Sequence, residues 1–184
     1  MQSSLALDLE GLTRECGEGL KGEGVMNRMA VQDLQIRRES PLAADLALLF
    51  QRHSADMHAD TPPESIHMLP REALEAPSVI FAVARLSGQP VAMGAVKRLD
   101  ARHGELKSMH VLAEYRGRGL SRQMLHHLID EARAIGLQRL SLETGIQPTF
   151  IAARALYQRE GFAGCGPFAG YGPDPNSVFM TRTI

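Results

Sequence analysis

The chain has 184 residues, of which 44% are hydrophobic and 22% are charged, the balance of an ordinary soluble globular domain. Lys plus Arg number 20 and Asp plus Glu 21, so no general basic field exists to hold duplex nucleic acid. The longest unbroken apolar run, 79–84, is too short to cross a bilayer, and the N-terminus lacks the pattern of an export signal. Cys16 and Cys165 provide neither a disulfide framework nor the spacing of a metal site. We expect a cytoplasmic protein that uses no metal and contacts neither membrane nor nucleic acid.

Residues 1–30 differ in composition from the rest of the chain. They contain several glycines among scattered charges, and their leucines follow neither a helical nor a strand period. This composition predicts a flexible N-terminal extension over 1–30, with a short helix packed on the domain as the alternative. The globular domain is expected to span 31–184.

The domain alternates short apolar runs with segments of helical period. In chain order the predicted elements are a strand at 34–37, a helix opened by Ser40 and Pro41, a loop around 61–63, strands at 79–86, 91–99 and 105–112, a helix from Leu120 that ends at Gly136, a strand at 139–143, a helix at 149–160 and a strand at 177–183. This order predicts an α/β (α+β) fold, with a mixed central sheet and flanking helices.

A short Gly/Arg loop precedes the clearest helix of the chain. It reads Arg116-Gly117-Arg118-Gly119-Leu120-Ser121 and lies between a predicted strand and that helix. Free backbone N–H groups and the helix dipole attract anions at such a position, and glycines let phosphate oxygens approach the backbone. A phosphate-binding loop and a merely structural turn are both open. The loop is neither a Walker loop nor a dinucleotide fingerprint, because the required residues are missing.

Two blocks of this sequence resemble the GCN5-related N-acetyltransferase (GNAT) family. The segment 111–120 looks like its acetyl-CoA-binding motif, Gln/Arg-x-x-Gly-x-Gly/Ala, with Arg116 and Gly119 in place and Ser121 departing at the last position. The segment 153–162 is similar to a second family block, although Phe150 stands where many members carry Asn. The resemblance extends from about Val31 to the C-terminus. Within the family, this sequence is similar to a bacterial subgroup of acetyltransferases. It implies the GNAT acyl-CoA N-acyltransferase fold, acetyl-CoA as co-substrate, an amine acceptor, direct transfer in a ternary complex, and a homodimer as one oligomeric state.

The resemblance also implies which residues contact acetyl-CoA. Backbone groups near the end of the strand before the loop pair with the pantetheine arm, and the loop binds the pyrophosphate. The implied set is Met109, His110, Val111, Arg116, Gly117, Arg118, Gly119, Leu120 and Ser121.

Acetyl transfer to an amine requires a group that takes the amine proton. Glu105 is the first candidate, because it lies on the strand that leads to the loop, where histone-type members of the family carry their catalytic Glu. Simple alternation would place Glu105 on the same strand face as Lys107, Met109 and Val111, and a surface Glu105–Lys107 pair is the structural alternative. Glu143 on the next strand is the second candidate, with hydrogen bonding to a turn as its alternative role.

Tyr157 matches the family's tyrosine near the cofactor sulfur, where a phenol protonates the departing thiolate; packing alone is the alternative. Glu64 and His67 beside Pro62-Pro63, and Tyr171 and Asp174 in the long Gly/Pro-rich stretch 164–176, are candidate acceptor-binding residues; plain surface loops are the alternative.

The resemblance and these candidate residues together predict an N-acetyltransferase that moves acetyl from acetyl-CoA to a primary amine. A catalytically silent acyl-CoA-binding module and an acyltransferase with a longer acyl group are the alternatives. The acceptor stays open among metabolites, antibiotic-like amines, peptide N-termini and lysines.

Overall fold

A computed structural model describes residues 33–184, so the expected extension 1–30 lies outside the described residues. The elements are β1 (Leu34–Arg38), η1 (Ala44–Leu46), α2 (Ala47–His58), η2 (Pro63–Ser65), α3 (Arg71–Leu74), β2 (Val79–Leu86), β3 (Gln89–Arg98), β4 (His103–Val111), η3 (Ala113–Tyr115), α4 (Leu120–Ala134), β5 (Arg139–Gly145), η4 (Pro148–Phe150), α5 (Ile151–Arg159), β6 (Ala163–Cys165) and β7 (Ser177–Thr183). All six predicted strands are present; α3 and the short β6 were not predicted. No helix within this part of the chain is both long and apolar enough to span a membrane.

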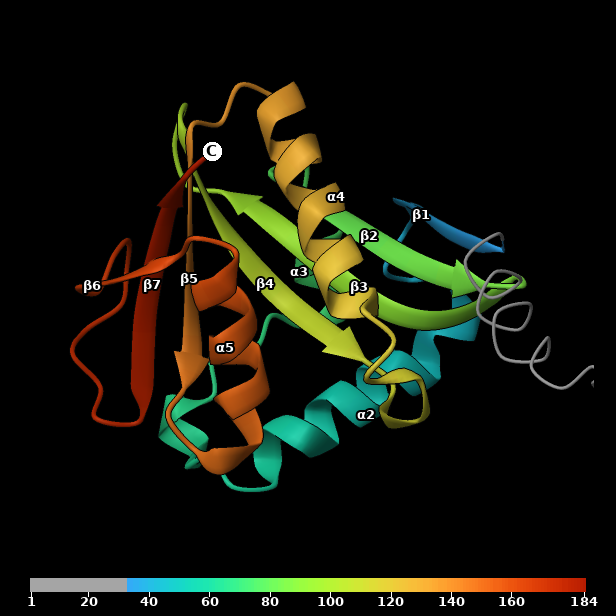
Figure 1. The fold of residues 1–184 in the computed structure, drawn as a ribbon, viewed down its shortest axis with the longest axis horizontal. Coiled ribbons are helices and arrows are strands. Elements are labelled where there is room, and N and C mark those ends of the chain that lie inside the picture. Colours follow the sequence, from blue (N-terminus) through green and yellow to red (C-terminus); the bar gives the residue numbers. More distant parts are fainter. Residues whose placement is uncertain (1–32) are drawn as a thin grey trace, which may run out of the picture. The chain divides into compact units, whose positions relative to one another are not determined.

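The strands form one mixed sheet in the order β1-β2-β3-β4-β5-β7-β6 (Figure 1). Neighbours are antiparallel except β4 and β5, which are parallel. Their pairing covers only three positions and ends at Glu105 opposite Ser141. Both strands continue beyond that point, to Val111 and Gly145, and Figure 1 shows them separating. The sheet therefore opens between β4 and β5, and the second half of β4 keeps its backbone groups on that side free of a strand partner.

Helices cover both faces of the sheet (Figure 1). On one face, the apolar stripe of α4 packs with Leu156 and Tyr157 of α5 over the sheet. On the other face, Leu46 and Leu49 at the start of α2 pack with Leu74 of α3. The predicted stripe of α4 is confirmed: Leu120, Met124, Leu125, Leu128, Ile129 and Ala132 are all buried.

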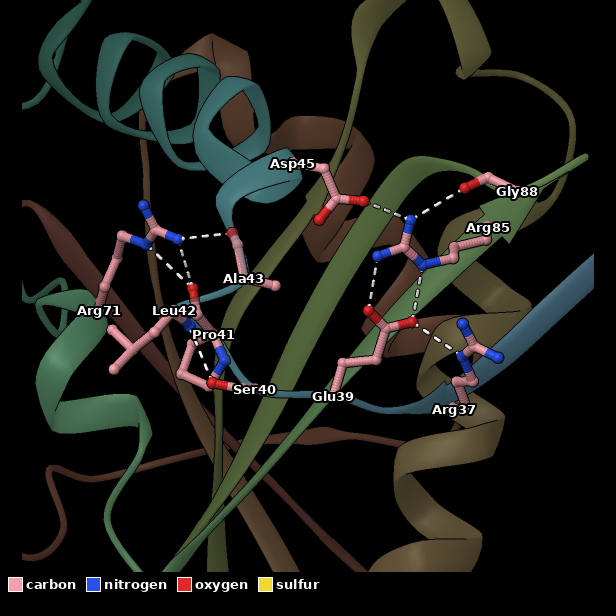
Figure 2. Close-up of polar contacts among 10 residues, drawn as sticks. All are labelled: Arg37, Glu39, Ser40, Pro41, Leu42, Ala43, Asp45, Arg71, Arg85 and Gly88. Carbon is pink, nitrogen blue, oxygen red and sulfur yellow. Dashed lines mark hydrogen bonds and ion pairs between the residues drawn. The ribbon is translucent and has the colours of Figure 1, made fainter.

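The helix expected to open at Ser40 begins later. Ser40 Oγ accepts the Leu42 N–H at 3.2 Å, which closes a local turn instead of capping a helix. Arg71 of α3 then donates to the carbonyl oxygens of Pro41 and Ala43, which keeps this segment out of a helical hydrogen-bond pattern (Figure 2). The 3-10 turn η1 starts at Ala44 and α2 at Ala47.

Arg85 of β2 also binds the segment between β1 and α2. Its guanidinium forms a two-pronged pair with Glu39 and a further ion pair with Asp45 (Figure 2). The hydrogen bond from Arg85 lowers the pKa of the Glu39 carboxyl. Arg71 and Arg85 thus hold the segment that leads into α2, and α2 carries several residues of the site described below.

A β-bulge in β4 changes which side chains share a face. Lys107 pairs with Ala95 and His110 pairs with Met93, so two residues of β4 stand opposite Gly94 alone. Ser108, within the bulge, has a φ of 53°, in the left-handed region. Leu106 and Met109 consequently both belong to the α4 side. The predicted common face of Glu105, Lys107, Met109 and Val111 is therefore wrong: Met109 and Val111 lie on the opposite face from Lys107.

Gly94 makes room for this bulge. An added Cβ there would lie 2.7 Å from Met109 Sδ and 2.8 Å from Leu128 Cδ1. We expect Gly94→Ala to lower the free energy of unfolding by about 1–3 kcal/mol through overpacking. Gly164→Ala, where an added Cβ meets nothing within 4 Å, is the matched control and should stay within about 0.5 kcal/mol of the wild type. Denaturant unfolding of both variants measures the difference, and equal stabilities would contradict the packing argument.

Candidate active site

A groove of about 420 Å³ lies beside the end of β4, between α2, α5 and the start of α4. Every residue of the predicted acetyl-CoA set lines it except Arg118. The Arg118 guanidinium instead lies 5.2 Å from the centre of the Tyr115 ring and donates to the Glu114 carbonyl. The structure therefore brings the strand end and the Gly/Arg loop to one cavity.

The loop has the backbone geometry of an anion site. Gly117 and Gly119 both have a φ of 76°, which favours glycine, and an added Cβ at either would meet no atom within 4 Å. Gly119 is the N-cap of α4 without a side-chain capping bond, and the first turn of α4 carries no acidic residue. The first N–H groups of a 15-residue helix thus face an open cavity, where the helix dipole favours a phosphate.

Arg116 ties the loop to α2. Its NH2 lies 2.5 Å from Asp56 Oδ2, and its Nε donates to the Val111 carbonyl at 3.0 Å. Both side chains of this ion pair are about half exposed, so the pair adds little stability. It nevertheless sets the distance between α2 and the end of β4, which are the two walls of the groove.

Sequence reasoning missed the contribution of α2 to the groove. His53, Asp56 and Met57 of this helix all line it. Their spacing of three and four residues places them on one helical face, a signal present in the sequence, but the partner of that face depends on how α2 packs. His53 and His110 lie with ring centres 5.4 Å apart, and burial lowers the pKa of each to about 4. Both imidazoles are therefore neutral near pH 7.

A second, smaller pocket of about 100 Å³ adjoins the groove where β4 and β5 separate. Its wall includes three side chains that can carry a charge and come from β4, β5 and the loop before α3: Lys107, Glu143 and His67. The two cavities share part of their walls: His53, Met57, Met109, Phe150, Ala153 and Tyr157. A molecule in the groove and one in the smaller pocket would meet at these residues.

Tyr157 occupies the junction of the two cavities. It is 6% exposed, and its ring packs edge-on against Phe162 at 5.7 Å between ring centres. Burial raises the pKa of the Tyr157 phenol well above its usual range, so it stays protonated across the working pH of proteins. At this junction it can therefore donate a hydrogen bond or a proton.

The two candidate bases lie in different environments. Glu105 is 3% exposed and lines neither cavity; its Oε1 accepts from Tyr171 Oη at 2.5 Å and lies 3.3 Å from Lys107 Nζ. Glu143 lies on the wall of the smaller pocket and accepts from Ser177 Oγ at 2.6 Å. Burial raises the pKa of the Glu143 carboxyl, which makes it a better proton acceptor than an ordinary glutamate.

Two loops meet beside the smaller pocket and bring in three of the four predicted acceptor-binding residues. His67 lines the pocket, and its carbonyl accepts from Lys107 Nζ at 2.8 Å. Tyr171 packs edge-on against the His67 ring at 5.0 Å and accepts from Lys107 Nζ at 2.7 Å. Asp174 lies 3.9 Å from His67 Nε2. Of the four residues, His67 alone lines a cavity; Tyr171 and Asp174 contact His67 from outside the pocket, and Glu64 is exposed on η2.

Other reactive side chains lie away from both cavities. Cys165 is exposed on the edge strand β6. The loss of water around part of its thiol raises the pKa of that group. His126 pairs with Glu160 at 2.7 Å across α4 and α5. Within residues 33–184 no three His, Cys, Asp or Glu side chains are arranged to hold a metal ion.

The chain is similar in sequence and structure to known acetyltransferases. The model of the "Acetyltransferase (GNAT) family" matches residues 46–162. An "Uncharacterized N-acetyltransferase YsnE" of Bacillus subtilis is 43% identical over 151 residues, covering 82% of this chain and 100% of its own length. An "IAA acetyltransferase" of Azospirillum brasilense is 42% identical and covers 83% of this chain and 99% of its own length. A crystal structure from Klebsiella pneumoniae, named as a candidate acyl-CoA N-acyltransferase, is 31% identical with a TM-score of 0.68 and covers 82% of this chain and 97% of its own.

Ligand-induced stabilisation tests the role of the Gly/Arg loop. Acetyl-CoA should raise the melting temperature of the wild type, because it binds the folded state. Gly119→Glu should abolish that shift by placing negative charge at the helix N-terminus. Gly136→Glu, at a φ of 84° behind α4, carries the same backbone strain outside the groove and should keep the shift. A shift that survives in Gly119→Glu would contradict the loop assignment.

Proposed function

Because the chain belongs to the GNAT family of acetyltransferases, we propose that it transfers an acetyl group from acetyl-CoA to a primary amine, directly and within a ternary complex. The observation that carries the proposal is the pair of joined cavities at the opening between β4 and β5. One cavity ends at the uncapped N-terminus of α4, and the partly buried carboxylate of Glu143 lines the other. The proposal includes a cytoplasmic location and allows a homodimer.

The groove fits a long, anionic thioester cofactor. The N–H groups of the loop and of the first turn of α4 would bind the pyrophosphate. The backbone of Met109 and Val111, on the edge of β4 that β5 leaves free, would pair with the amides of the pantetheine arm as a strand does. Acetyl-CoA supplies the acetyl group as a thioester at the junction of the two cavities, where Tyr157 lies.

We assign proton removal to Glu143 and a supporting role to Glu105. Glu143 borders the smaller pocket, whereas Tyr171 and Lys107 cover the carboxylate of Glu105. The amine binds next to Glu143 and gives it a proton as the new N–C bond forms, while the C–S bond breaks. Tyr157 donates to the departing sulfur. Glu105 positions Lys107 and Tyr171, which in turn hold the two loops beside the pocket.

The two glutamates can be told apart by their amide variants. Glu143→Gln should lower kcat by about 100-fold or more near pH 7, and its rate should rise with pH as the amine loses its proton in solution instead. Glu105→Gln should lose less. Thiol release from acetyl-CoA over pH 5–9, with cofactor affinity measured beside it, gives both values. If Glu105→Gln lowers kcat more than Glu143→Gln does, Glu105 is the base and the assignment to Glu143 is wrong.

Tyr157→Phe tests the proton donor, because it removes only the hydroxyl and keeps the ring packing against Phe162. We expect turnover to fall by about 10- to 1,000-fold with cofactor affinity nearly unchanged, since only a transition-state interaction is lost. If the melting temperature falls while activity per folded molecule stays the same, the hydroxyl serves the fold. Acetyl-CoA binding without thiol release from the wild type, over a broad amine panel, would instead indicate a silent binding module.

A further inference from the structure

The smaller pocket restricts what can enter it. Its volume of about 100 Å³ is a quarter of that of the groove. The loop with His67 and Met68 borders it. Lys107 of β4 donates to the His67 carbonyl, and Asn176 Nδ2 donates to Ser65 Oγ at 3.2 Å, which joins this loop to the stretch 164–176. Ser65 is itself buried, so this contact fixes the end of one loop against the other. The smaller space suits a slender group better than a bulky one.

The charges around the pocket do not balance. The ammonium of Lys107 is compensated by Glu105 at 3.3 Å, and both side chains are buried. His67 lies near Asp174. Glu143 accepts a hydrogen bond from Ser177, and the charges of Lys107 and His67 act on it only at longer range, because it forms no ion pair with any side chain of residues 33–184. A partly buried carboxylate without an ion-pair partner is destabilised, and a cation in the pocket would offset that cost.

The rest of the wall is apolar. Met57, Met68, Leu106, Leu142 and Phe150 surround the space between Lys107 and Glu143. Methionine side chains adapt to the shape of what they enclose, and this wall suits a methylene chain. A carboxylate on the acceptor would lie here beside the carboxylate of Glu143. The one lysine of the wall, Lys107, already forms an ion pair with Glu105 and is not free to compensate it.

From these three features we infer that the acceptor, in the reaction proposed above, enters the pocket as a slender aliphatic ammonium group whose chain carries no carboxylate. The ammonium pairs with Glu143 and passes one proton through this carboxylate to water, which leaves the neutral amine that then attacks the thioester. Its methylene chain lies along the methionine and leucine wall. Free alkylamines and the side chain of a peptide lysine share this chemistry. The α-amine of an amino acid does not have it, because the neighbouring carboxylate would lie beside Glu143.

A matched series of amines tests the inference. Butylamine, 1,4-diaminobutane and 4-aminobutanoate have similar length and differ in the charge at their far end, and Nα-acetyl-lysine amide presents the same butylammonium arm on a peptide unit. We expect kcat/KM for butylamine to exceed that for 4-aminobutanoate by about tenfold or more. Higher activity with butylamine than with the lysine amide would indicate a free amine as the source, and higher activity with the lysine amide would indicate a side chain. Equal or higher activity with 4-aminobutanoate would overturn the inference.

Binding measured without turnover separates this inference from the proposed reaction. Calorimetry on the protein saturated with CoA should show butylamine binding about tenfold tighter than 4-aminobutanoate. Glu143→Gln should remove that preference, whereas Glu72→Gln, an exposed glutamate that lines neither cavity, should keep it. If the preference holds but no thiol is released, the proposed reaction fails and the pocket assignment stands. If both amines bind alike, the pocket assignment fails whatever the activity.

Discussion

The site depends on one constraint in the sheet, the end of pairing between β4 and β5. Two parallel strands held together over their whole length would satisfy each other's backbone groups and leave no cavity between them. Here the pairing stops at Glu105 and Ser141, and the strands separate while each remains paired on its other side, β4 with β3 and β5 with β7. The outer partners therefore keep both strands extended across the opening. Both cavities border this opening, and helices α2 and α5 supply the rest of their walls.

The bulge at Ser108 distributes the side chains of β4 between the two faces. Before the bulge, Glu105 and Lys107 belong to the face that α2 and the two loops cover. After it, Met109 and Val111 face α4 and α5, and His110 returns to the side of α2. Without the extra residue, Met109 would stand on the α2 side, and the small pocket would lose part of the wall that it shares with the groove. A single irregularity in backbone pairing thus allows one strand to serve both cavities.

Local signals in the sequence were sufficient for most of the fold and for the position of the Gly/Arg loop before α4. Apolar runs bounded by turn residues predicted the strands, and the stripe from Leu120 to Ala132 predicted the buried face of α4, because both patterns depend on short stretches of chain. The bulge at Ser108 could not be read in this way, since it depends on how β4 aligns with Gly94 on another strand. The late start of α2 depends on Arg71 and Arg85, which are distant in sequence from the segment that they hold. Glu105 and Glu143 were both identified as candidates, but only the folded chain shows which of them borders a cavity.

The two cavities present opposite electrostatic environments to the two reactants. At the far end of the groove, the uncapped N–H groups and the dipole of α4 favour an anion. In the smaller pocket, the partly buried carboxylate of Glu143 favours a cation. Between them, the shared wall around Tyr157 and the neutral His53 carries no net charge near pH 7. In the proposed reaction, an anionic cofactor and a cationic amine would each be drawn to a separate end, and their reacting groups, both neutral when they combine, would meet in the uncharged section. Charge separation along the opening would thus orient two different molecules without any residue having to bind both.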